Sequence, residues 1–198
     1  RNIPHANSAT KKGDWPRLRG QSMEGKIIGL VGFGAIGQQV ARRLQGFDCT
    51  LLAFDPFPNQ AVAETFNVSL LPLEEVLARA DVVSLHLPAL PETRNSVNAD
   101  FLGKMKPGAI LINTARGEIV NEADLLVALN SGHLQGVGLD AFAVEPPGAD
   151  NPLLKLPQVI ATPHTGSHTD GATKAMGWGA FRECLAVLRG EKPNHRII

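Results

Sequence analysis

The most informative segment of the sequence is Ile27-Ile28-Gly29-Leu30-Val31-Gly32-Phe33-Gly34-Ala35-Ile36-Gly37. Its first five residues carry no apolar–polar alternation, which is typical of a strand covered on both faces. The last six form a Gly-x-Gly-x-x-Gly pattern, and Ile36, Val40 and Leu44 then recur at the spacing of one helix face. A strand, a glycine-rich turn and a helix in this order predict a dinucleotide-binding unit.

Each glycine of this glycine turn (residues 32–37) has a separate predicted task. Gly32 permits the tight turn, Gly34 lets the backbone approach a pyrophosphate, and Gly37 lets the helix pack closely on the strand. The unpaired N–H groups at the start of the helix would bind the phosphates. The alternative is a turn whose glycines serve packing alone.

An acid at the end of the second predicted strand favours the nucleotide interpretation. Asp55 lies 18 residues after Gly37 and would accept hydrogen bonds from both ribose hydroxyls. Its charge would repel a 2′-phosphate, and Pro56 and Phe57 offer no cation to neutralise one. We therefore expect NAD rather than NADP, while a plain turn residue at position 55 stays an open alternative.

Similar apolar runs and helical patterns alternate along the rest of the chain. Further strands are expected at 51–54, 82–85, 109–112, 137–139 and 159–161, helices around 73–77 and 125–129, and a closing helix at 170–190. Parallel strands need such crossovers, so the sequence predicts an α/β fold with a doubly wound parallel sheet, the Rossmann type, over residues 26–198. Residues 1–25 are polar, show no apolar period and are expected to form an N-terminal arm.

Composition narrows the classes of partner. The 198 residues include 19 Lys+Arg against 19 Asp+Glu, which predicts no nucleic-acid partner. No apolar run reaches the roughly 18 residues of a membrane span, so no membrane partner is expected. Cys49 and Cys184 lie far apart in the sequence and without a Cys-x-x-Cys spacing, which favours a reduced, cytoplasmic setting.

Three polar clusters follow the later strands, where ligands of open α/β sheets bind. The arginine turn (residues 113–117) contains Arg116, whose guanidinium could hold a carboxylate with two hydrogen bonds. The acid loop begins after Asp140 and contains Glu145, and the histidine loop (residues 162–168) contains His164. A histidine that titrates near neutral pH, beside an acid, predicts proton exchange with a hydroxyl. A surface arginine, a loop acid and a structural histidine are the alternatives at these positions.

We expect no metal site. His164 and His168 are four residues apart, but Pro163 and Gly166 argue against a helix that would bring them together. The turn His86-Leu87-Pro88 after the strand at 82–85 either faces the cofactor or only ends the strand.

Taken together, these motifs resemble the NAD-binding domain of the D-isomer-specific 2-hydroxyacid dehydrogenase family. The segments that carry the resemblance are Gly13-Asp14-Trp15, Gly32–Gly37, Asp55-Pro56, His86-Leu87-Pro88, Lys106-Pro107-Gly108, Thr114–Gly117, Leu139-Asp140, Glu145-Pro146 and Thr162-Pro163-His164. Each segment is short, and it is their order and spacing that make the resemblance specific.

The resemblance implies a set of functional residues. The family's catalytic arginine, glutamate and histidine fall on Arg116, Glu145 and His164, and its acid for the nicotinamide carboxamide falls on Asp140. The family also implies cofactor binding at Asp140 and at the catalytic His164. The other cofactor-binding positions that it implies are Gly32, Gly34, Ala35, Ile36, Gly37, Asp55, Leu87, Pro88, Thr114, Ala115 and Gly166.

The resemblance also implies a reaction and partners. Hydride would pass between NAD(H) and a D-2-hydroxy or 2-keto acid; the runs 54–57 and 162–167 look most like phosphoglycerate dehydrogenases of serine biosynthesis, which act on D-3-phosphoglycerate. The arm would link to a substrate domain missing from this chain, and two copies would form a homodimer through this domain. An NAD-sensing corepressor and a formate or phosphite dehydrogenase are the alternative functions.

Overall fold

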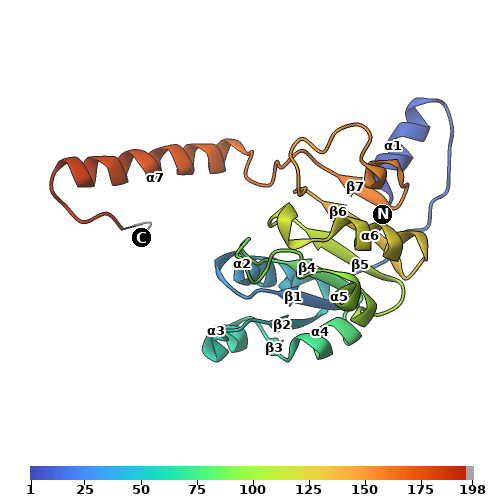
Figure 1. Ribbon diagram of the computed structural model, residues 1–198, viewed down its shortest axis with the longest axis horizontal. Coiled ribbons are helices and arrows are strands. Elements are labelled where there is room, and N and C mark those ends of the chain that lie inside the picture. The colour runs from blue at the N-terminus through green and yellow to red at the C-terminus, as the bar shows by residue number, and fades with distance from the viewer. Residues whose placement is uncertain (195–198) are drawn as a thin grey trace.

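The fold is a single parallel sheet with helices on both faces. The computed structural model describes residues 1–194, so the last four residues of the expected domain 26–198 lie outside it. The sheet has seven strands in the order β3-β2-β1-β4-β5-β6-β7, and every neighbouring pair is parallel (Figure 1). The strands are β1 (Ile27–Val31), β2 (Thr50–Phe54), β3 (Val68–Leu70), β4 (Val82–Leu85), β5 (Ala109–Asn113), β6 (Leu134–Leu139) and β7 (Val159–Ala161). The predicted α/β fold is confirmed.

Two apolar cores lie on opposite faces of this sheet. The helices are α1 (Ile3–Lys11), α2 (Ala35–Leu44), α3 (Gln60–Thr65), α4 (Leu73–Arg79), α5 (Ala99–Lys104), α6 (Glu122–Asn130) and α7 (Asp170–Leu188), with short 3₁₀ turns η1 (Gln45–Phe47), η2 (Gly117–Ile119) and η3 (Pro152–Lys155). Buried residues of α4, α5 and α6 form one core with β4, β5 and β6, and those of α2 and α3 form the other with β1 and β2. Because all strands are parallel, their carboxyl ends meet at one edge, where a site can form.

The sequence missed short elements. Strand β3 at the edge of the sheet has only three residues, and helices α3 and α5 have six each. A short edge strand carries too few residues to show a period, so pairing with β2 and not local pattern defines β3. Helix α6 is capped by Asn121, whose Oδ1 accepts hydrogen bonds from the amides of Ala123 and Asp124.

The two terminal segments differ from expectation. The arm contains a helix, α1, although its sequence shows no clear apolar stripe. Helix α7 lies where a closing helix was expected, but it extends away from the sheet, and none of its residues, all described, is buried (Figure 1). Its exposed apolar side chains include Met176, Trp178 and Phe181.

Candidate active site

The glycine turn leaves no room for side chains at two of its glycines. Gly32 has a φ of +97°, and a Cβ there would lie 2.6 Å from the carbonyl oxygen of His86. A Cβ on Gly37 would overlap the carbonyl oxygen of Gly32. A Cβ on Gly34, in contrast, would meet no heavy atom within 4 Å. The turn is therefore packed on its inner side and open at Gly34.

Helix α2 begins directly at this opening. Its N-cap is Gly34, and no side chain caps its first amides, which belong to Ala35 and Ile36. Such uncapped amides, with the positive end of the helix dipole, bind phosphate oxygens.

Asp55 extends the same site from the end of β2. Its Oδ2 accepts a hydrogen bond from the amide of Phe33 at 2.7 Å, and its Oδ1 accepts one from the amide of Phe57 at 2.9 Å. A carboxylate has about four acceptor positions, so each oxygen keeps a lone pair for a ribose hydroxyl. Asp55 thus ties the glycine turn to β2 and can still bind a ligand.

His86 lies beneath the glycine turn at the end of β4. Its Cδ2 would be 3.7 Å from a Cβ on Gly37, and Leu87 Cδ2 would be 3.3 Å from one on Gly32. Burial lowers the pKa of His86 to about 4, so the ring is neutral at neutral pH. Among residues 1–194, its Nε2 is the one fully buried side-chain nitrogen or oxygen without a hydrogen-bond partner. The exposed Pro88 follows these two residues and leads away from the turn.

The arginine turn is shaped by a buried asparagine. Asn113, at the end of β5, donates from Nδ2 to the carbonyl of Arg116 at 2.9 Å and accepts from the amide of Ala115 at 3.0 Å. Thr114 between them is exposed, and Arg116 donates from Nη1 to the carbonyl of Ala115 at 2.7 Å. The turn therefore presents the Arg116 guanidinium at the surface.

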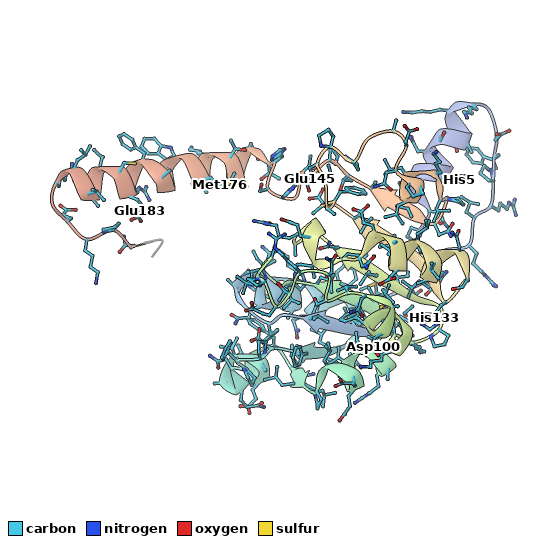
Figure 2. All side chains as sticks on the ribbon, viewed as in Figure 1. His5, Asp100, His133, Glu145, Met176 and Glu183 are labelled. Carbon is cyan, nitrogen blue, oxygen red and sulfur yellow. The ribbon has the colours of Figure 1, made fainter. Side chains whose placement is uncertain are left out.

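His164 and Glu145 form a hydrogen-bonded pair at the carboxyl edge. Nδ1 of His164 lies 2.8 Å from Oε2 and 3.1 Å from Oε1 of Glu145. The pair lies at the upper rim of the sheet, near the start of α7, where Figure 2 labels Glu145. The hydrogen bond from His164 and that from the amide of Phe142 hold the pKa of Glu145 below its usual value, and the charge of Arg116 lowers it further. The side chains of His164 and Glu145 thus meet, and Arg116 lies near enough for its charge to act on Glu145.

The histidine loop is organised by Asp140. Its Oδ1 accepts from the hydroxyl of Thr162 at 2.5 Å and from the amide of Thr165 at 2.9 Å, and its Oδ2 accepts from the amide of Gly166 at 2.8 Å. Burial alone would raise the pKa of Asp140, but these hydrogen bonds lower it. Both oxygens are therefore engaged within the protein, and only a remaining lone pair of Oδ2 is left for a ligand.

These bonds hold His164 in an unusual backbone conformation. Its φ is +53°, in the left-handed region that β-carbons disfavour. Such strain persists only where surrounding contacts impose it, and it is concentrated at functional sites. Here it turns the imidazole toward Glu145. A cavity of about 390 Å³ lies beside the pair, walled by Phe142 and Leu154.

The residues present give no support for a metal. Within residues 1–194, no group of three or more His, Cys, Asp or Glu side chains is placed to hold an ion. His168 lies on the same loop as His164, and the described residues add no third ligand to them. In the same part of the chain, no helix has the length and apolar character needed to cross a membrane.

Sequence reasoning did not single out three residues that shape the site. Asn113 and Thr162 position the arginine turn and the histidine loop, and a Cβ on Gly117 would overlap the backbone of Phe142. A polar residue that ends an otherwise apolar strand, as Asn113 does, is the signal that could have found the first. Nothing in the sequence indicates the contact between Gly117 and Phe142, because it joins segments 25 residues apart.

Comparison with known proteins defines the class. The family model described as "D-isomer specific 2-hydroxyacid dehydrogenase, NAD binding domain" matches residues 1–166. The chain belongs to this family. It is 42% identical over 194 residues to D-3-phosphoglycerate dehydrogenase of Methanocaldococcus jannaschii, covering 96% of this chain and 37% of that protein. The enzyme of the same name from Bacillus subtilis is 42% identical over 192 residues, covering 96% of this chain and 36% of that protein.

Solved structures of the family superpose on the whole chain. D-lactate dehydrogenase with NAD⁺ from Lactobacillus jensenii has a TM-score of 0.87 at 30% identity, covering 100% of this chain and 64% of that one. A protein from Thermus thermophilus has a TM-score of 0.91 at 38% identity, covering 100% of this chain and 63% of that one. The chain thus spans little more than a third of the length of the curated relatives.

The residues at the edge fit the family's cofactor, NAD. The turn is open at Gly34 where a pyrophosphate would approach, the first amides of α2 are uncapped, and Asp55 keeps free lone pairs at the end of the neighbouring strand. Gly32 and Gly37 hold this opening in place because neither can accept a side chain.

Proposed function

We propose that this chain carries the cofactor site and the reacting residues of an NAD-dependent dehydrogenase for D-2-hydroxy acids. The observation that carries the proposal is the contact between Glu145 and His164, with the charge of Arg116 acting on Glu145, at the edge that also holds the glycine turn. A guanidinium, an imidazole and a carboxylate at that edge suit a substrate with a carboxylate beside a hydroxyl.

The glycine turn and Asp55 would hold NAD, which would supply the hydride chemistry between C2 of the hydroxy acid and C2 of the keto acid. Arg116 binds the substrate carboxylate and polarises the C2 oxygen. During oxidation, Nε2 of His164 takes the hydroxyl proton as the C2–H bond breaks and the C=O bond forms; in reduction it returns that proton. Glu145 keeps the proton on Nδ1 and stabilises the imidazolium that results.

D-3-phosphoglycerate is the substrate that we propose within this class. The proposal is supported by the identity of about 42% with curated phosphoglycerate dehydrogenases, and with it comes a role in serine biosynthesis. A cytoplasmic location is supported by the two free cysteines, Cys49 and Cys184. A homodimer formed through this domain, with the exposed Trp15 of the arm at the interface, is expected, and light scattering tests it.

The decisive experiment is a substrate screen on the natural protein that contains this chain, with NAD and NADH. The panel holds D-3-phosphoglycerate, D-lactate, D-glycerate, formate and phosphite. Fastest turnover of D-3-phosphoglycerate supports the full proposal, and turnover of another D-hydroxy acid supports only the class. Turnover of formate or phosphite alone contradicts it. NAD binding without any turnover would favour an NAD-sensing corepressor.

A further inference from the structure

Glu122 joins two ends of the acid loop (residues 141–151). It is the first residue of α6, and its Oε1 accepts a hydrogen bond from the amide of Ala143 at 2.9 Å. Its Oε2 accepts one from Nδ2 of Asn151, also at 2.9 Å. The loop between these two partners carries Glu145. One half-buried carboxylate therefore holds the loop just before and well after the residue that contacts His164.

The far end of the loop is itself fixed. Oδ1 of Asn151 accepts a hydrogen bond from the amide of Leu153 at 2.9 Å, and the Leu153 side chain is fully buried in the core with α6. Asn151 is therefore fixed relative to η3. Its hydrogen bond to Glu122 fixes that carboxylate, which in turn holds the amide of Ala143.

The near end of the loop is held from a second side. A Cβ on Gly117 would overlap the carbonyl group of Phe142, so the two backbones are in direct contact. Gly117 directly follows Arg116. The segment that presents Arg116 and the start of α6 thus hold the Phe142–Ala143 backbone between them. The amide of Phe142, in turn, donates to Oε1 of Glu145 at 3.1 Å.

We propose that Glu122 is a positioning residue for the reacting pair. By fixing Ala143, it maintains the hydrogen bond from the amide of Phe142 to Glu145. The Glu145 carboxylate then stays hydrogen-bonded to Nδ1 of His164. The proton of the neutral imidazole then stays on Nδ1, which leaves Nε2 to exchange a proton with the substrate. The consequence for turnover rests on the proposed function; the consequence for the imidazole does not.

A merely structural role for Glu122 makes a different prediction. A carboxylate at the start of a helix interacts with the helix dipole and, as here, closes a loop, so its loss lowers stability in either case. Only a positioning role moves the proton within the His164 ring. The test therefore reads the ring directly.

The experiment measures the imidazole ¹⁵N chemical shifts of the 198-residue chain at a pH where the ring is neutral. These shifts show which ring nitrogen carries the proton, and H164Q assigns the signals. With Glu122→Ala we expect part of the Nδ1–H population to shift to Nε2–H. A ¹³C titration should show the pKa of Glu145 rising toward its usual value, because its hydrogen bonds from Phe142 and His164 weaken. In the natural protein, kcat should fall by up to about 100-fold with the KM for NAD unchanged.

Two further variants separate positioning from folding. Glu122→Gln keeps an acceptor for Ala143 but loses the bond from Asn151, and adding Asn151→Asp restores that bond with donor and acceptor exchanged. Glu122→Gln should reduce the population of the Nδ1–H tautomer of His164, and the double variant with Asn151→Asp should restore it. Glu75→Ala is the matched control, since Glu75 is likewise an acid in the first turn of a helix, α4.

An unchanged tautomer ratio in a folded Glu122→Ala chain overturns the proposal, whatever the activity. If Glu122→Ala does not fold, an unchanged ratio in Asn151→Ala and in Glu122→Gln does the same. A shifted ratio in a protein that turns over no hydroxy acid sustains the positioning role and refutes the proposed function instead.

Discussion

The two halves of the carboxyl edge build their sites by different means. The nucleotide half, the glycine turn, is one continuous segment whose backbone carries the function, and its glycines matter because a side chain would not fit. The reacting half collects side chains from three loops between residues 113 and 166. Two of these loops are shaped by hydrogen bonds, one donated by Asn113 and others accepted by Asp140. A larger side chain in the glycine turn should therefore impair the nucleotide half. Loss of a hydrogen-bonding group should impair the reacting half.

The largest effect is expected from His164→Ala. Turnover of the natural protein should fall by about 10²- to 10⁴-fold, because general acid–base catalysis contributes that much. NAD should still bind, because the phosphates and the ribose are expected at the glycine turn and Asp55, which contact each other and His86. Stopped-flow turnover and calorimetric NAD titration check the two statements.

His168→Ala is the matched control, because this histidine is exposed on the same loop. Equal losses in both variants would attribute the effect to the loop and not to the imidazole of His164. Normal turnover without His164 would remove this residue from the proposed mechanism.

The second prediction compares two glycines of the glycine turn. A Cβ on Gly37 forces the backbone of Gly32 to move, and such overpacking costs about 1–3 kcal/mol. Gly37→Ala should therefore lower the unfolding midpoint and weaken NAD binding by about 10- to 100-fold. Gly34→Ala meets open space at a φ of −71°, so it should leave the midpoint unchanged and weaken NAD binding alone.

Thermal unfolding with and without NAD distinguishes these outcomes. A stable Gly34→Ala protein with normal NAD affinity would show that the phosphates do not approach this residue. A Gly37→Ala protein of unchanged stability would contradict the close packing of the turn.

The contrast between a local turn and a site built from distant loops also explains which features could be predicted from the sequence. Ile27 to Gly37 specifies strand, turn and helix within a local segment, so the fold and the nucleotide half were accessible from pattern alone. The arginine, the glutamate and the histidine could be named from their places after strands. Contacts such as Glu122 with Ala143 depend on how distant segments pack, and no local pattern encodes them.

The hydrogen bonds that Asp140 accepts could not be predicted from the sequence for the same reason. The family resemblance assigns this acid to the cofactor, and the structure adds hydrogen bonds to it from the hydroxyl of Thr162 and the amides of Thr165 and Gly166. The path of α7 also has no local signature, because its helical pattern predicts a helix but not the surface it contacts.

The third prediction concerns acid stability in the reacting half. Asp140→Asn replaces one acceptor oxygen by a donor that faces the amide of Gly166, which should cost about 1–3 kcal/mol of unfolding free energy at pH 7. Because the folded-state pKa of Asp140 is lowered, its contribution is complete above the unfolded-state pKa of about 3.9 and is lost as the pH falls through the folded-state pKa.

Urea unfolding between pH 7 and pH 3 tests this dependence. The difference between the native protein and Asp140→Asn should be constant down to about pH 5 and narrow below it. A difference that does not depend on pH would mean that the charge of Asp140 contributes nothing, and that the amide clash alone destabilises the variant.

The smallest change in binding is expected from substitution of Asp55, which combines features of the nucleotide half and the reacting half. Its carboxylate accepts a hydrogen bond from the amide of Phe33 and so supports the glycine turn, just as Asn113 and Asp140 support the loops of the reacting half. The same carboxylate would present a negative charge to the nucleotide. Asp55→Ala should weaken NAD binding by about tenfold, or about 1.4 kcal/mol, and improve binding of NADP, because the repulsion of a 2′-phosphate is removed.

Asp55→Asn separates the two roles, since it keeps an acceptor for Phe33 and removes the charge. Fluorescence titrations with NADH and NADPH, together with thermal unfolding, provide the measurement. If charge sets cofactor choice, both variants gain affinity for NADPH and only Asp55→Ala loses stability. If the support of the turn dominates, Asp55→Asn retains the affinity and the selectivity of the native protein, and the preference for NAD must then come from the turn itself.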